Sequence, residues 1–269
     1  MTRINDMEED IAITREKWQN RYLDSQSDKY KRSCVPSTVK ISSGYARNFL
    51  FDNKPESGIL LEAGCGTART SLDVSFSGEL TIICVDISMG ALEQARKLFK
   101  ENNPSAKVYF VCCDLRTLPF KGASIGHIFS DGAIEHFRDT GLSVKEFYRV
   151  LKSGGRVFAT VPCVSFSMFT YGQLQGNIPD IFLLRNLFEV IHIKMLRSKL
   201  MTNGYELSFI PGKIRGIFKN AGFKYPRIGL FDTFNEIKFV RNQFLKQIFR
   251  RLTKMRMFWP LIYIFAEKQ

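Results

Sequence analysis

The residues best suited to chemistry stand in one short stretch, 59–67, which reads Ile-Leu-Leu-Glu-Ala-Gly-Cys-Gly-Thr. Its apolar start is typical of a buried parallel strand, and Glu62 stands near the end of that strand. Gly64 and Gly66 follow at alternate positions, where the missing side chains let a ligand approach the backbone of a tight turn. Open α/β sheets bind nucleoside-containing cofactors at turns of this kind, at the carboxyl ends of their strands.

The carboxylate of Glu62 favours one class of cofactor over another. It would repel a pyrophosphate, and Arg69 stands where the dinucleotide-binding pattern G-x-G-x-x-G has its third glycine. S-adenosylmethionine carries a sulfonium and an ammonium group, and a carboxylate attracts both. We therefore expect a methyl-donor site that includes Glu62, Gly64, Cys65 and Gly66.

The surrounding pattern predicts the elements that hold this site. Strand-like apolar runs cover residues 58–63, 80–85, 108–113, 125–129 and 156–161. Helix-like spacing separates them, and the last of these helices is expected to stop at Ser153-Gly154-Gly155. Such β-α units predict a doubly wound, mostly parallel sheet. Further strands near 225–233 and 260–266, one of them reversed, would complete a seven-stranded α/β sheet.

The flanking segments divide the chain into four parts. Residues 1–57 are polar with helical spacing, and we expect helices that precede the sheet and lie over the cofactor. Residues 58–163 would form the cofactor-binding core. Residues 164–206 interrupt the alternation of strands and helices. The amphipathic helix expected over 181–200 predicts a helical lid inserted after the fifth strand. Residues 207–269 would complete the core sheet and add a basic helix.

Composition limits the class of protein. The 269 residues are 45% hydrophobic and 24% charged, which is typical of one globular domain with elaborations. Six cysteines without C-x-x-C spacing and three scattered histidines predict reduced thiols and no metal site. The N-terminus lacks the apolar core of a signal peptide, and the uncharged run 157–179 contains proline and glycine. We therefore expect a cytoplasmic protein without a transmembrane helix.

The net charge of +13 is concentrated in the C-terminal third, because residues 185–269 hold 17 basic and 5 acidic residues. Such a surface favours anionic partners. Residues 238–256 interleave apolar residues with seven basic ones and no acid. The pattern favours a helix whose apolar stripe packs on the sheet. The alternative is peripheral contact with an anionic membrane surface, and nucleic acid is the less favoured partner.

Further along the chain, the strand ends extend the pattern. The chain resembles the class I S-adenosylmethionine-dependent methyltransferases, specifically the small-molecule group that includes ubiquinone and menaquinone biosynthesis enzymes. The resemblance rests on five segments in the family's order: 61–67, Asp86, Asp114-Leu115, 132–136 (Gly-Ala-Ile-Glu-His) and 151–155 (Leu-Lys-Ser-Gly-Gly). It implies a Rossmann-like methyltransferase fold with S-adenosylmethionine as the cofactor.

The resemblance also implies roles for the strand-end residues. Asp86 would accept both ribose hydroxyls, and Ile87 would flank the adenine. Asp114, with the backbone of Leu115, would read the adenine amino group. Asp131 replaces the more common Asn or Gln of the family and would face the sulfonium, with a catalytic role left open.

His136 is the candidate general base. Methyl transfer is an in-line displacement in which alignment supplies most of the rate effect, and a hydroxyl acceptor also needs a base for its proton. Glu-His recurs at this position throughout the family, so the alternative is a structural role, in which the residue caps the helix or braces the loop. The sequence thus predicts transfer of a methyl group to a small acceptor, apolar or lipid-linked, mainly on oxygen.

The sequence also allows two other functions. One is an RNA methyltransferase that uses the basic C-terminal third. Its cytosine-5 variant, with Cys163 as nucleophile, is disfavoured because no Pro-Cys follows the fourth strand. The other is a catalytically inactive methyltransferase fold that serves as a binding subunit.

Overall fold

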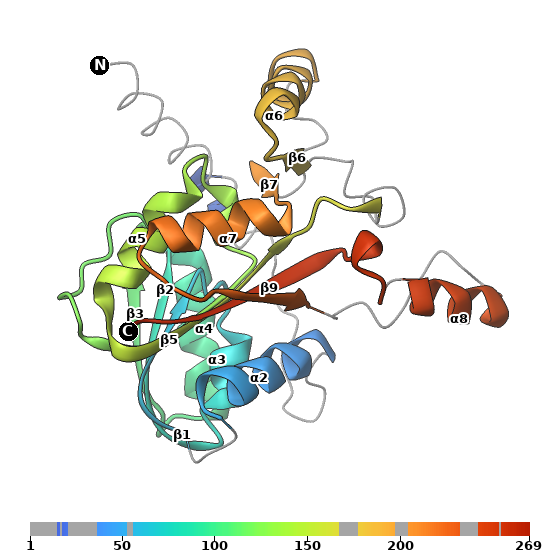
Figure 1. Ribbon diagram of the computed structural model, residues 1–269. Helices are drawn as coiled ribbons and strands as arrows, with labels where there is room; N and C mark the ends of the chain where they lie inside the picture. Colours follow the sequence, from blue (N-terminus) through green and yellow to red (C-terminus); the bar gives the residue numbers. More distant parts are fainter. Residues whose placement is uncertain are drawn as a thin grey trace, which may run out of the picture.

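The computed structural model describes residues 15–16, 18–20, 37–52, 56–166, 177–196, 204–231, 242–252 and 254–269. A twisted sheet runs through the centre of the molecule, and helices cover both of its faces (Figure 1). Two separate hydrophobic clusters, one on each face, form the core. The described part of the chain is thus a three-layer α/β structure.

The seven strands of the sheet lie in the order β3-β2-β1-β4-β5-β9-β8. Their bounds are β1 Glu56–Ala63, β2 Gly78–Asp86, β3 Lys107–Cys112, β4 Ile125–Asp131, β5 Leu151–Pro162, β8 Arg227–Leu230 and β9 Leu261–Glu267. Strands β1 to β5 are parallel, and β9 runs antiparallel to both β5 and β8. The predicted doubly wound, mostly parallel seven-stranded sheet is confirmed.

Side chains of neighbouring strand residues pack in the hydrophobic clusters on opposite faces of the sheet, because successive strand residues point to opposite faces. Leu60 of β1 packs in the cluster with α2 (Ser37–Leu50), α3 (Arg69–Val74) and α4 (Met89–Asn102). Leu61 packs in the cluster with α5 (Thr140–Val150) and α7 (Pro211–Asn220). Both leucines are at most 1% exposed. This explains why the central strands read as continuous apolar runs rather than as alternating ones.

The junction between α5 and β5 differs from the prediction. The strand begins at Leu151, directly after the helix, instead of at Arg156. Residues Gly154 and Gly155 join the sheet because Gly154 N–H donates to the carbonyl of Lys268, and Lys268 N–H donates to that of Gly155. The partner lies more than a hundred positions away, so local helix-stop signals pointed to a turn where a strand forms.

The insertion after β5 has its own small sheet, which the sequence did not predict. Strand β6 (Asn177–Pro179) pairs in parallel with β7 (Glu206–Ser208). Between them, α6 covers only Phe182–Glu189 and continues as a π-helical segment, η4, to Met195. Residues 197–200 of the helix predicted over 181–200 lie outside the described residues.

The basic helix is α8 (Gln243–Leu252), and a short turn of 3₁₀ helix, η5 (Arg256–Phe258), follows it. The expectation that its apolar stripe packs on the sheet is wrong, because Phe244, Leu245 and Ile248 are exposed. Figure 1 shows α8 projecting from the body of the molecule. Residues 238–241 of the predicted helix lie outside the described residues. Within the described chain, no helix is both long and apolar enough to span a bilayer.

Candidate functional site

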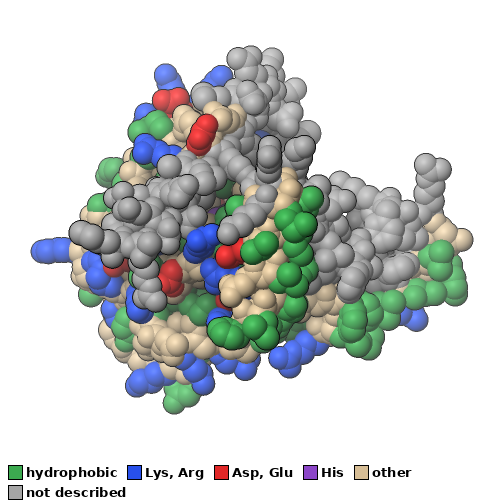
Figure 2. Space-filling view, turned by 90° about the horizontal axis from the view of Figure 1, so that it is seen from above, with side chains coloured by type: hydrophobic (Ala, Val, Ile, Leu, Met, Phe, Trp, Pro, Cys, Tyr) green, Lys and Arg blue, Asp and Glu red, His purple; other side chains and the backbone are tan. Residues whose placement is uncertain are grey.

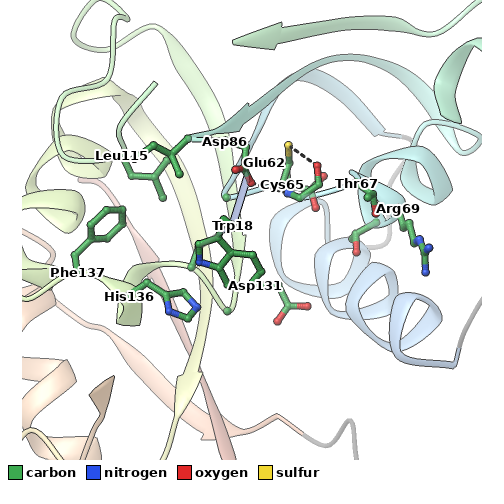
Figure 3. Close-up of a pocket in the computed structure, with 16 residues that line it drawn as sticks. Trp18, Glu62, Cys65, Thr67, Arg69, Asp86, Leu115, Asp131, His136 and Phe137 are labelled. Carbon is green, nitrogen blue, oxygen red and sulfur yellow. Dashed lines mark hydrogen bonds between the residues drawn. The ribbon is translucent and has the colours of Figure 1, made fainter. Parts of the chain in front are cut away.

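A cavity of about 280 Å³ opens at the carboxyl ends of β1, β2 and β4 (Figure 3). Its lining comes from the glycine loop after β1, the residues that follow β2, β3 and β4, and one N-terminal side chain. The lining residues are Trp18, Glu62, Gly64, Cys65, Gly66, Thr67, Arg69, Thr70, Asp86, Ile87, Leu115, Asp131, Gly132, Ala133, His136 and Phe137. The volume is comparable with that of the smaller ligand sites of proteins.

The glycine loop is held against the neighbouring strand and the neighbouring loop. The N–H groups of Gly64 and Cys65 both donate to the carbonyl of Val85, at 2.8 and 2.9 Å. Gly64 has a φ of 74°, a left-handed value that costs other residues about 1–2 kcal/mol. A Cβ at Gly64 would also overlap the Cβ of Ala133. Glycine is therefore required here by backbone conformation and by space.

Asp86 lies at the end of β2 with its carboxylate fixed by two backbone groups. Gly66 N–H donates to Oδ2 at 2.8 Å, and Ser88 N–H donates to Oδ1 at 2.9 Å. Burial raises the pKa of this carboxyl group, while the two hydrogen bonds oppose that rise. Each oxygen retains a lone pair, so the group can still accept hydrogen bonds from a diol.

Glu62 is buried beneath the glycine loop. Its Oε2 accepts from Ser71 N–H in α3 at 3.3 Å. Burial raises the pKa of Glu62 to about 8, and the nearby Asp131 and Asp86 contribute to the rise. Because burial disfavours the ionised form, a cationic ligand in the cavity would stabilise the ionised carboxylate.

Asp131 is oriented by two hydroxyl groups from distant parts of the chain. Ser42 of α2 donates to Oδ2 at 2.7 Å, and Thr160 of β5 donates to Oδ1 at 2.6 Å. The Thr160 hydroxyl in turn accepts from Gly132 N–H at 3.0 Å. Burial raises the pKa of Asp131 above its usual range. The carboxylate therefore has one fixed orientation at the cavity wall.

His136 connects the cavity to the insertion after β5. Its Nδ1 lies 2.7 Å from the backbone carbonyl oxygen of Tyr205. Since a carbonyl oxygen can only accept, Nδ1 carries the proton, and the lone pair of the neutral ring lies on Nε2. The indole of Trp18 packs edge-on against the imidazole, with ring centroids 5.3 Å apart. This tautomer is the one that a base acting through Nε2 requires.

Two acidic residues, Asp114 and Glu135, belong to the segments that carry the family resemblance but lie outside the cavity lining. Asp114 forms an ion pair with Arg116, whose Nη2 donates to Oδ2 at 2.8 Å. The guanidinium of Arg116 in turn lies over the Phe137 ring. Glu135 is 3% exposed, and its burial raises its pKa well above the usual range. The adenine-reading role of Asp114 stays a prediction, because its carboxylate faces Arg116 in this structure.

The structure adds lining residues that sequence reasoning missed, among them Trp18, Arg69, Thr70 and Phe137. Figure 3 shows Arg69 at one end of the cavity, with His136 and Phe137 at the other. Arg69 could have been foreseen as a cation that directly follows the glycine loop. Trp18 could not, because nothing local ties it to a site more than forty positions away.

Cys163 lies outside the cavity lining and has the character of a structural thiol. It is buried, its backbone bridges to Phe209, and burial raises the pKa of its thiol to about 12. A nucleophilic cysteine needs a lowered pKa. The structure therefore argues against the cytosine-5 alternative.

Comparison with known proteins gives both partial and full-length matches. A family model described as a methyltransferase domain matches residues 61–159. A malonyl-[acyl-carrier protein] O-methyltransferase of Methylovorus sp. (strain MP688) is 35% identical over 100 residues, which are 36% of this chain and 34% of that protein. An O-methyltransferase of Pyrenophora dematioidea is 28% identical over 98 residues, 36% of this chain and 37% of that protein. The chain thus matches about a third of the length of these curated relatives.

Similarity in structure extends further than similarity in sequence. Geranyl diphosphate C-methyltransferase from Streptomyces coelicolor A3(2), solved with S-adenosyl-L-homocysteine, superposes with a TM-score of 0.63 at 13% identity. The superposition covers 97% of this chain and 98% of that one. At this level of identity the match establishes the fold.

Proposed function

The chain carries a methyltransferase domain of the class I S-adenosylmethionine-dependent family, and from this premise we propose that it transfers a methyl group from S-adenosylmethionine to a small acceptor. The observation that supports this most strongly is the convergence of Glu62, Asp86 and Asp131 on one cavity, beside a glycine loop that leaves the backbone accessible. Three carboxylates suit a ligand that carries two positive charges and a ribose diol. They would repel a pyrophosphate.

Each of several cavity residues would bind a different chemical group of this cofactor. Asp86, fixed by Gly66 and Ser88, would accept hydrogen bonds from the ribose hydroxyls. Glu62 and Asp131 would face the ammonium and sulfonium groups. Arg69, at the end of the cavity away from His136, is the cation available to the cofactor carboxylate. Ile87 and Leu115 provide apolar contacts for the adenine.

Catalysis in this proposal rests on alignment and on one proton transfer. Bound S-adenosylmethionine supplies a methyl group that its positive sulfur makes electrophilic. The protein positions the acceptor in line with that carbon and excludes water, which accounts for most of the rate effect. His136, held by Tyr205 in the tautomer with its lone pair on Nε2, would remove the proton from an acceptor hydroxyl.

An apolar or lipid-linked acceptor is supported by the surface of the insertion. The apolar residues Phe182, Leu183 and Leu187 of α6 are 86%, 75% and 53% exposed. The insertion leaves the core after β5, at the edge of the sheet where the cavity opens. Isolated exposed apolar residues need no explanation, but several on one short helix favour contact with an apolar ligand or surface.

Two experiments, calorimetry followed by a transfer assay, test this function. The full chain is titrated with S-adenosylmethionine, and we expect micromolar binding that Asp86→Ala weakens strongly. An assay with tritiated methyl donor on cell extract, separated into lipid, RNA, protein and small polar fractions, then identifies the acceptor class. We expect label in the lipid or apolar small-molecule fraction. Absence of cofactor binding in the wild type would refute the enzyme, and binding without transfer would instead support the inactive binding subunit.

A further inference from the structure

The α8 helix exposes an apolar face to solvent. Asn242 directly precedes the helix, and its side-chain oxygen accepts from the backbone N–H groups of Phe244 and Leu245 at 2.9 and 3.2 Å. Phe244 and Ile248 are four positions apart, so they share one face, and they are 71% and 39% exposed. No described helix or strand packs extensively on α8. A capped helix thus presents large apolar side chains that the core does not use.

The same segment is strongly basic. Residues 238–256 hold seven basic residues and no acid, and Arg251, Lys254 and Arg256 are all exposed. Met255 and Met257 are about half exposed beside them. Figure 2 shows hydrophobic side chains on the arm that carries α8, with Lys or Arg side chains next to them. The exposed apolar and cationic side chains named above therefore belong to one segment, residues 242–252 and 254–257, which we call the α8 arm.

An anionic lipid bilayer is the partner that satisfies both features. Phe244 and Ile248 would enter the boundary between headgroups and acyl chains, while the cations contact lipid phosphates. A second copy of the chain would bring two basic surfaces together, which electrostatic repulsion disfavours. RNA would pair with the cations but leave the apolar face in water. We propose that the α8 arm docks this protein on the surface of membranes that contain anionic lipids.

The connectivity gives this docking a direction. The helix lies in the connection from the end of β8 to the start of the reversed strand β9. Because β8 runs parallel to β1–β5, that connection lies at the carboxyl edge of the sheet, the edge at which the cavity opens. Docking through the α8 arm would bring this edge toward the bilayer. An acceptor held in the membrane would then lie near the cavity, although the docking itself does not depend on methyl transfer.

Sedimentation with lipid vesicles tests the proposal on the full chain. One set of vesicles is phosphatidylcholine alone, and the other contains equal parts of phosphatidylcholine and phosphatidylglycerol. We expect binding only to the anionic set. Phe244→Gln with Ile248→Gln should weaken it at least about tenfold, because each buried apolar side chain contributes substantially. Arg251→Gln and Lys254→Gln should each weaken it about fivefold, since a cation near an anionic surface contributes about that much.

A matched control separates the α8 arm from the basic surface as a whole. Lys224 and Tyr225 are both exposed, and they lie outside the arm. Their double variant, Lys224→Gln with Tyr225→Gln, loses one charge and one ring and should bind vesicles like the wild type. All variants should keep the wild-type Tm because the altered side chains are exposed.

Three results would overturn the proposal. The first is equal binding by the wild type and the Phe244→Gln, Ile248→Gln variant. The second is RNA binding without vesicle binding. The third is a concentration-dependent dimer in the wild type that the same double variant converts to a monomer. If the wild type binds S-adenosylmethionine but no vesicles, the docking proposal is refuted and the proposed methyltransferase function is not.

Discussion

His136 and Tyr205 are joined by a hydrogen bond across 69 positions of sequence, from imidazole Nδ1 to a backbone carbonyl oxygen 2.7 Å away. Tyr205 is itself held by side chains of the insertion. Its hydroxyl donates to Glu189 Oε1 at 2.6 Å and accepts from Arg185 at 3.1 Å. Arg185 also pairs with Asp180 at 3.0 Å. The insertion after β5 therefore sets the orientation of a cavity residue without lining the cavity with any of its described side chains.

Replacing His136 by glutamine separates a catalytic role from a structural one. The glutamine amide can still donate to the carbonyl of Tyr205, but it cannot accept a proton. If His136 is the base, kcat should fall about 10²- to 10⁴-fold. The affinity for S-adenosylmethionine, measured by calorimetry, should stay within about twofold of wild type because neither charge nor volume at the cofactor changes much. An unchanged kcat would assign His136 the role of bracing the loop.

Tyr205→Phe tests how firmly the insertion is held. The change removes the hydroxyl that bonds Glu189 and Arg185 and retains the ring. We expect the free energy of unfolding to fall by about 1–3 kcal/mol, because two partly buried partners each lose a hydrogen bond. Urea denaturation measures this. Tyr109→Phe is the matched control, since Tyr109 is 61% exposed, and it should leave stability unchanged. Equal effects of the two changes would contradict a role for the Tyr205 hydroxyl.

Gly64→Ala should impair both folding and cofactor binding. The new methyl group would meet the Cβ of Ala133, and the left-handed φ of 74° adds strain. We expect a loss of at least about 2 kcal/mol in the free energy of unfolding. Adding Ala133→Gly removes the overlap and should restore part of that loss, so the two changes should be strongly non-additive.

Gly44→Ala provides the control for the glycine substitution. Gly44 lies in α2 with open space around the position of a Cβ, so alanine there should be neutral or stabilising by up to about 1 kcal/mol. Additive effects of Gly64→Ala and Ala133→Gly would show that the close approach of the two loops is not what constrains Gly64.

The positions that the sequence predicted well are those whose signal is local. An apolar run, an acid and two glycines specify a strand end and its turn within nine residues, and Glu62, Gly64 and Gly66 do line one cavity. Asp86 joins them because parallel strands end at the same edge of a sheet. The sequence alone therefore predicts that the glycine loop and the residues at the ends of β2 and β4 lie together.

The positions that the sequence missed depend on long-range contacts. Trp18 reaches the cavity from a segment separated in sequence from the core, and Gly154 and Gly155 join the sheet through hydrogen bonds with the backbone of Lys268. The exposure of α8 was also beyond sequence reasoning. An apolar stripe with helical spacing looks the same whether it packs on a sheet or faces a membrane, since both environments select the same periodicity.

The raised pKa of Glu62 predicts how stability depends on pH in the absence of cofactor. Its pKa rises from 4.5 in the unfolded chain to about 8 in the folded protein, so the protonated form favours folding. This contribution is complete below 4.5 and is lost as the pH rises toward 8. The slope is up to about 1.4 kcal/mol per pH unit. Urea denaturation from about pH 5 to about pH 7.5 should show stability falling with pH, and Glu62→Gln should flatten that dependence.

The same carboxyl group links cofactor binding to proton release. A bound ligand with sulfonium and ammonium groups would lower the pKa of Glu62, so binding near pH 6.5 should release up to about one proton. Calorimetry in two buffers of different ionisation enthalpy measures this release. Glu62→Gln should abolish most of it while removing no volume from the side chain. If the variant releases as many protons as the wild type, Glu62 does not face the positive groups of the cofactor.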